Sequence, residues 1–113
     1  MNIPNVTTNN FADEVEKQAL PVLLDFWAPW CGQCTMLTKV IERVAEKVKG
    51  KAIVCKVNAD DSQAGELVRK FSITKLPTLV LTERGNEISR VSGMLSETAL
   101  TNLILNSNEK NSK

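Results

Sequence analysis

The chain has 113 residues, of which 42% are hydrophobic and 24% are charged, and its formal net charge is +1. This size and balance are typical of one globular domain with a single core. The near-zero charge gives no indication of a nucleic-acid partner, and no apolar run approaches the roughly 18 residues of a membrane span. The first ten residues, "MNIPNVTTNN", contain no basic or apolar segment, so we expect no secretory signal.

Three cysteines and no histidine limit the chemistry that the chain can carry out. Ser–His and Cys–His pairs cannot be built, nor can zinc sites that need histidine, and three thiolates are too few for a four-cysteine metal site. So few cysteines also differ from a disulfide-stapled secreted scaffold, which favours a reducing, cytoplasmic setting. A cysteine pair could here carry reversible sulfur chemistry or bind a soft metal such as Cu(I).

Helical and strand patterns alternate through the first two-thirds of the chain. Apolar residues at helical spacing predict three helices, and short apolar runs with β-branched residues predict two buried strands. In chain order these elements are a helix at 9–20, a strand at 21–27, a helix at 34–49, a strand at 52–58 and a helix at 62–71.

A hairpin and a last helix follow. The strands 76–82 and 88–92 flank the turn "ERGNE", in which Gly85 or Asn86 supplies the turn geometry. Ser96 is expected to cap a final helix, and the polar tail at 107–113 is expected to lack regular structure. We therefore expect one α/β domain at 1–106, with a central mixed β-sheet and helices on both faces.

The stretch "WCGQC" places Cys31 and Cys34 at the junction between a predicted strand and a long helix. Backbone N–H groups at a helix N-terminus lack partners and the helix dipole favours negative charge, so both stabilise a thiolate at Cys31. Cys34 lies within the first turn and can therefore attack a mixed disulfide on Cys31. The alternatives are two inert core cysteines or a weak metal clip, and the flanking Trp30 and Gly32 favour neither.

Asp25 interrupts the apolar run "VLLDFW". Burying an unpaired carboxylate is costly, so Asp25 must be protonated, hydrated or paired. Lys56 in the next predicted strand is a candidate partner, unless both side chains reach solvent at the strand ends. Cys55 has no cysteine neighbour and is expected to be a small core residue.

The motif "WAPWCGQC", the acidic strand residue before it and "LPT" at 76–78 resemble the thioredoxin family. The resemblance extends from about Ile3 to Ile104 and implies the thioredoxin fold for 1–106. It implies a protein-disulfide reductase that works by dithiol–disulfide exchange through a mixed disulfide. It also implies no bound cofactor, electrons from NADPH through a flavoprotein thioredoxin reductase, disulfide-containing protein substrates, and a cytoplasmic monomer.

The same resemblance implies roles for individual residues. Cys31 would be the attacking thiol, Cys34 the resolving thiol, and the two together the redox-active disulfide. Asp25 would exchange a proton with Cys34, tuned by Lys56. Contacts to the substrate are expected from Trp30, Gly32, Gln33, Leu76, Pro77, Gly93 and Met94. Within that set, Pro77 matches the family's cis-proline, and Gly93 matches a loop glycine that allows close approach of a substrate chain.

Three residues depart from the commonest family pattern. Gln33 replaces a proline, so its backbone N–H is expected to lie near the Cys31 sulfur and to favour the thiolate. Lys39 replaces a proline that often kinks the helix, so we expect a straighter helix. Lys75 replaces a small residue and adds positive charge at the substrate rim. A disulfide oxidase or isomerase of the same fold, a binding module with incidental thiols, and a Cu(I) chaperone stay open.

Overall fold

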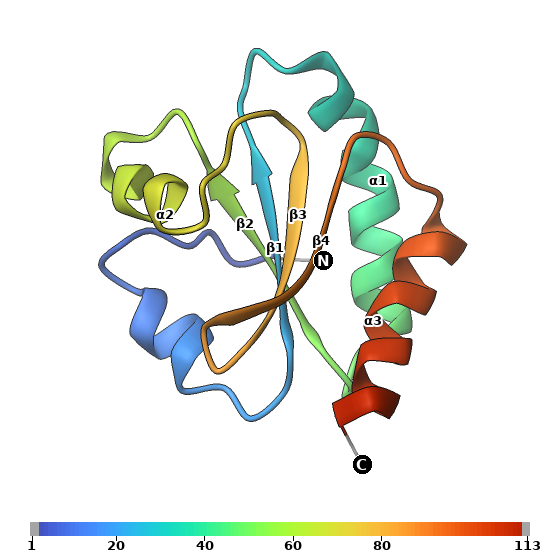
Figure 1. Cartoon of the computed structure of the whole chain (residues 1–113). Helices are drawn as coiled ribbons and strands as arrows, with labels where there is room; N and C mark the ends of the chain where they lie inside the picture. Colours follow the sequence, from blue (N-terminus) through green and yellow to red (C-terminus); the bar gives the residue numbers. More distant parts are fainter. Residues whose placement is uncertain (1–2, 112–113) are drawn as a thin grey trace.

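The computed structural model describes residues 3–111 (Figure 1). Its centre is a four-stranded sheet with the order β2-β1-β3-β4. The strands are β1 (Val22–Trp27), β2 (Ile53–Asn58), β3 (Thr78–Glu83) and β4 (Asn86–Ser92). β1 and β2 are parallel, whereas the β1–β3 and β3–β4 pairs are antiparallel, so the predicted mixed sheet is confirmed.

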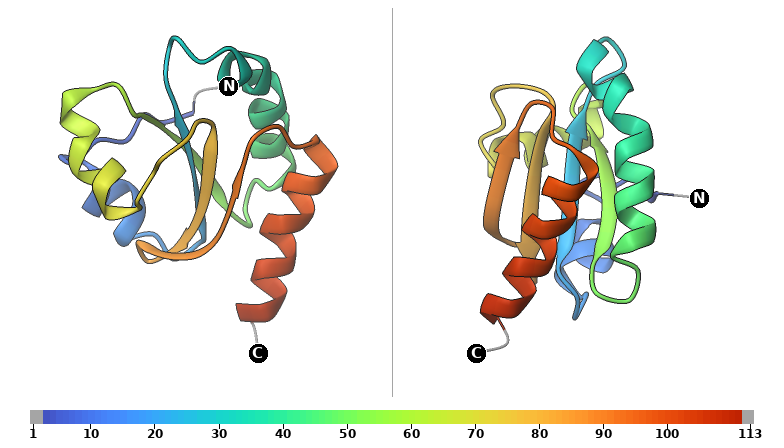
Figure 2. Two further views of the ribbon diagram at one scale, coloured as in Figure 1. Left: turned by 45° about the horizontal axis from the view of Figure 1, so that its top comes forward. Right: turned by 90° about the vertical axis from the view of Figure 1, so that its right-hand side faces the viewer.

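Helices cover both faces of this sheet (Figures 1 and 2). The helices α1 (Gly32–Lys47) and α3 (Glu97–Asn111) lie on one face. The other face carries the π-helical turn η1 (Ala12–Glu16), the 3₁₀ turn η2 (Ser62–Ala64) and the helix α2 (Gly65–Lys70). Within residues 3–111 no helix combines the length and the apolar character needed to cross a bilayer.

The alternating side chains of β1 divide the core into two halves. Val22, Leu24 and Phe26 pack against η1 and α2, whereas Leu23 packs against α1 and α3. Successive strand residues point to opposite faces, so Asp25 belongs to the face covered by α1. Because both faces are covered, every β1 residue before Trp27 is buried, as the continuous apolar run predicted.

Two segments differ from the sequence expectation. Only Ala12–Glu16 of the helix expected at 9–20 is helical, because no side chain caps its start and the following Pro21 disfavours helical backbone before it. At the other end, α3 continues to Asn111, so the part of the tail at 107–111 is helical and not irregular. A helix already begun, here capped by Ser96 through the Ala99 N–H, extends readily through polar residues. Residues 112–113 lie outside the described residues.

The β3–β4 hairpin contains a bulge. Its two turn residues, Arg84 and Gly85, have φ angles of +53° and +86°, so the predicted turn glycine is confirmed. Thr82 pairs with Glu87, but its neighbour Leu81 pairs with Ser89, so one residue of β4 has no partner. That residue is Ile88, which is exposed.

Candidate active site

Cys31 is the N-cap of α1, at the end of the short connection from β1. Its backbone is extended, with φ −90° and ψ 108°, and its Sγ accepts a hydrogen bond from the Cys34 N–H at 3.2 Å. The predicted position at a helix N-terminus is therefore confirmed. A negative charge on this sulfur would be stabilised by that N–H and by the helix dipole.

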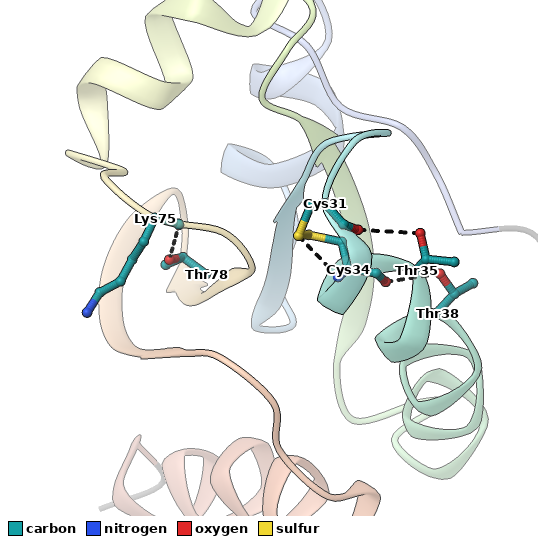
Figure 3. The surroundings of a disulfide bond; sticks show 6 residues. All are labelled: Cys31, Cys34, Thr35, Thr38, Lys75 and Thr78. Atoms are coloured by element: carbon teal, nitrogen blue, oxygen red, sulfur yellow. Dashed lines mark hydrogen bonds between the residues drawn. A yellow bond between two sulfur atoms is a disulfide. The ribbon is translucent and has the colours of Figure 1, made fainter.

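Cys31 and Cys34 form a disulfide, with their Cα atoms 5.3 Å apart (Figure 3). Their relative exposures are only 7% and 5%, and Ala28, Trp27 and Leu76 pack against them. Trp27 thus lies beside the cysteine turn. The pair is held in an apolar setting and can shuttle between disulfide and dithiol.

The position of Gln33 corrects one expectation. The backbone N–H that donates to the Cys31 sulfur belongs to Cys34, and within the described residues no hydrogen bond joins Gln33 to that sulfur. In an N-cap the accepting side chain meets the N–H of the second or the third helical residue, and here it meets the third. Lys39 lies inside the uninterrupted helix α1, as expected.

Two threonines add hydrogen bonds that the sequence reasoning missed. Thr35 Oγ1 donates to the Cys31 carbonyl at 3.4 Å, and Thr38 Oγ1 donates to the Cys34 carbonyl at 3.3 Å (Figure 3). Threonine in a helix commonly bonds to the carbonyl four residues earlier, so the spacing of four from each cysteine could have predicted both bonds.

Asp25 is 4% exposed, and burial raises its pKa from 3.8 to about 7, against the opposing positive charge of Lys56. Its Oδ1 has no hydrogen-bond partner within residues 3–111. Lys56 is its register partner in β2, and Lys56 Nζ lies 5.1 Å from the centroid of the Trp27 ring. The structure therefore places Lys56 beside Asp25 as the sequence suggested, without a direct ion pair between them.

The loops expected to contact the substrate lie close together. The Leu76–Pro77 bond is cis, and the Gly93 N–H donates to the Pro77 carbonyl at 3.0 Å. Gly93 has a φ of +87°, which glycine adopts far more readily than other residues. Trp30 and Met94 expose 70% and 43% of their surface.

A hollow of about 210 Å³ lies beside Trp30. It is lined by Trp30, Ala59, Val68, Ile73, Thr74, Lys75 and Leu76. Lys75 is the charged residue of this set, and its side chain points away from the disulfide (Figure 3). The sequence reasoning missed Ala59, although it follows β2 at the same sheet edge where β1 ends, and its N–H bonds to the Trp27 carbonyl at 2.7 Å.

Cys55 takes no part in this site. It is a free, fully buried cysteine in the core half that contains Leu24, and burial together with the charge of Glu14 raises its pKa to about 12. The prediction of a small core residue is confirmed.

Comparison with known proteins gives one consistent result. The family model for thioredoxin matches residues 2–106. The chain is 35% identical over 104 residues to a thioredoxin of Pyropia yezoensis, covering 92% of this chain and 95% of the relative. It is 38% identical over 96 residues to thioredoxin 1 of Nostoc sp., covering 85% and 88%. It is 37% identical over 100 residues to a thioredoxin of Haemophilus influenzae, covering 88% and 92%.

Near-full-length similarity, the mixed sheet and a Cys-x-x-Cys pair at disulfide distance confirm the expected chemistry, dithiol–disulfide exchange through Cys31 and Cys34. Thioredoxins need no bound cofactor, and the family as a whole acts on disulfide substrates and is served by reductases. The chain belongs to the thioredoxin family of protein-disulfide reductases.

Proposed function

We propose that this protein reduces the disulfides of cytoplasmic proteins with Cys31 as the attacking thiol and Cys34 as the resolving thiol. The observation that carries the assignment is the hydrogen bond from the Cys34 N–H to Cys31 Sγ at the N-terminus of α1. It favours the thiolate form of Cys31, and the thiolate is the nucleophile in disulfide exchange.

The reaction then has two exchange steps. The Cys31 thiolate attacks one sulfur of the substrate disulfide, forms a mixed disulfide and releases the other substrate sulfur as a thiolate, which takes up a proton. Cys34 loses its proton and attacks Cys31 Sγ. The Cys31–Cys34 disulfide forms and the second substrate thiol leaves, so two electrons have passed to the substrate.

We propose that Asp25 accepts the proton that the Cys34 thiol loses. Asp25 lies on the face of β1 that α1 covers, and its pKa of about 7 lets it accept and return a proton near neutral pH. The positive charge of Lys56 holds that pKa lower than burial alone would, so we assign Lys56 the tuning role.

The surface around the disulfide suits an extended peptide. We propose contacts to the substrate from Trp30, Gly32, Gln33, Leu76, Pro77, Gly93 and Met94. Pro77 has no N–H, so a substrate strand is expected to pair with the backbone of Leu76 beside it. The hollow beside Trp30 would take an apolar side chain next to the substrate cysteine.

We further propose that residues 1–106 form the thioredoxin domain, that 107–113 is a polar extension of it, and that the protein acts as a monomer. Electrons would come from NADPH through a flavoprotein thioredoxin reductase. Family membership supports this route. Each round of substrate reduction leaves the Cys31–Cys34 pair as a disulfide, which a reductase must then reduce.

Reduction of insulin tests both parts of the proposal. With dithiothreitol as the electron source, the protein should speed insulin reduction, and Cys31→Ser should abolish the effect. With NADPH and thioredoxin reductase in place of dithiothreitol, NADPH consumption should depend on the protein. Absence of the first effect would contradict the reductase function, whereas absence of the second alone would contradict the electron route.

A further inference from the structure

We propose that Arg90 and Ser92 on β4 are positioning residues for the substrate-contacting segment 71–78. They hold this segment at its two ends through Phe71 and Thr78. The inference rests on the proposed function, because 71–78 includes Leu76, Pro77 and one wall of the hollow beside Trp30.

The bulge in β4 determines the face of the sheet to which Arg90 points. Val80 pairs with Arg90 and Thr82 pairs with Glu87, with Ile88 as the extra residue. Because Val80 and Thr82 are two apart in β3, they point to one face, so Arg90 and Glu87 share that face despite being three apart.

The shared face lets Glu87 orient the guanidinium. Arg90 Nε donates to Glu87 Oε2 at 2.7 Å, and Arg90 Nη2 donates to Oε1 at 2.6 Å. The hydrogen bonds from Arg90 lower the pKa of Glu87, so this pair stays charged at neutral pH. A bidentate pair of this kind fixes the plane of the guanidinium.

The oriented guanidinium reaches the first end of the segment. Arg90 Nη2 also donates to the carbonyl of Phe71, the residue that caps the C-terminus of α2. The Phe71 ring is buried and lies 6.0 Å from the ring of Phe11 and 5.9 Å from that of Phe26. After this anchored residue the chain turns at Ser72, with a φ of +50°, and enters the wall of the hollow.

The hydroxyl groups of Thr78 and Ser92 hold the second end of the segment 71–78. Thr78 Oγ1 donates to the Lys75 carbonyl at 2.7 Å, across Leu76 and Pro77 (Figure 3). Ser92 Oγ lies 3.0 Å from Thr78 Oγ1, and because the Thr78 proton is already used, Ser92 is the donor. The Gly93 N–H bonds to the Pro77 carbonyl, so β4 and the residue after it hold the turn that faces the disulfide.

This arrangement predicts a defect in substrate binding and not in sulfur chemistry. Between the two anchors lie Ile73, Thr74, Lys75 and Leu76, which form one wall of the hollow. Cys31 and Cys34 lie at the start of α1, and the hydrogen bond from the Cys34 N–H to the Cys31 sulfur does not involve this wall. If the wall is held less firmly in place, binding of a protein substrate should weaken. The reactivity of the Cys31 sulfur should not change.

The test measures insulin reduction and, in parallel, reduction of dithiobis(nitrobenzoate), a small disulfide that does not need the wall. Arg90→Met and Ser92→Ala should each raise the KM for insulin about three- to tenfold, the size expected for the loss of one hydrogen bond. The kcat of each variant should change less than about twofold. Rates with the small disulfide should not change. Arg90→Lys keeps one donor and Ser92→Thr keeps the hydroxyl, so both should recover part of the lost affinity. Lys49→Met, which removes an exposed positive charge elsewhere, is the control.

Each result decides between positioning and mere stabilisation. Equal losses with insulin and the small disulfide, an unchanged KM for insulin in both variants, or no recovery in Arg90→Lys and Ser92→Thr would overturn the inference. If Arg90→Met does not fold, Ser92→Ala and Ser92→Thr still decide. Failure of the wild-type protein to reduce insulin would instead contradict the proposed function.

Discussion

The backbone N–H of Cys34 donates a hydrogen bond of 3.2 Å to the sulfur of Cys31. This bond makes Cys31 the side-chain N-cap of α1. The partial positive charge that stabilises the attacking Cys31 thiolate is therefore that of the backbone N–H of Cys34, the resolving cysteine. Replacing the side chain of Cys34 or of Gln33 therefore leaves the donor in place.

A first prediction concerns Gln33. Because the Cys34 N–H is the donor, Gln33→Pro removes a backbone N–H that does not bond to the sulfur. Proline is tolerated in the first turn of a helix, so the turn should keep its geometry. We expect the pKa of Cys31, measured from the pH dependence of its alkylation, to change by less than about 0.3 units, a small part of a hydrogen bond to a charged group. A rise of a full unit would show that Gln33 supplies the donor after all.

A second prediction concerns Asp25 and pH. Burial raises its pKa from 3.8 to about 7, so between these values the folded state binds more protons than the unfolded state. The free energy of unfolding must then fall as pH rises from about 4 to about 7, by up to about 4 kcal/mol, and level off above.

Asp25→Ala removes this titration. Compared with wild type, the variant should gain stability progressively between pH 4 and pH 8 in urea unfolding, and it should reduce insulin more slowly. A stability difference that stays constant over this pH range would be incompatible with a buried carboxyl that titrates near neutral pH.

A third prediction uses two glycines with the same backbone. Gly93 and Gly50 have φ angles of +87° and +84°, and a Cβ added to either would meet no atom within 4 Å. Alanine at each site should therefore lower stability by a similar amount, about 1 kcal/mol, through backbone strain alone. Gly93→Ala should also raise the KM for insulin, since Gly93 lies beside Pro77, whereas Gly50→Ala should not. Equal kinetics for the two variants would remove Gly93 from the substrate site.

Much of this architecture could be predicted because local patterns and burial agree. The apolar run around Leu23 and Leu24 predicted a buried strand, and the helical spacing of apolar residues after Cys34 predicted that Cys31 lies where a helix begins. The hydrogen-bonded links from Arg90 and Ser92 could not be predicted, because they depend on a bulge at Ile88 that shifts the register by one residue. No sequence period marks such a shift. The hollow beside Trp30 is lined by residues from three loops and from α2, so it became visible only in three dimensions.

The central claim is the division of roles between Cys31 and Cys34, and trapping of mixed disulfides tests it most directly. Cys34→Ser keeps the N–H that stabilises the Cys31 thiolate but removes the resolving thiol, so it should accumulate a covalent complex with insulin or with cell proteins. Cys31→Ser should accumulate almost none. The complexes are counted by mass spectrometry under non-reducing conditions, with release by dithiothreitol as the control. Abundant trapping by Cys34→Ser alone is the predicted result, and equal trapping by the two variants would contradict the account.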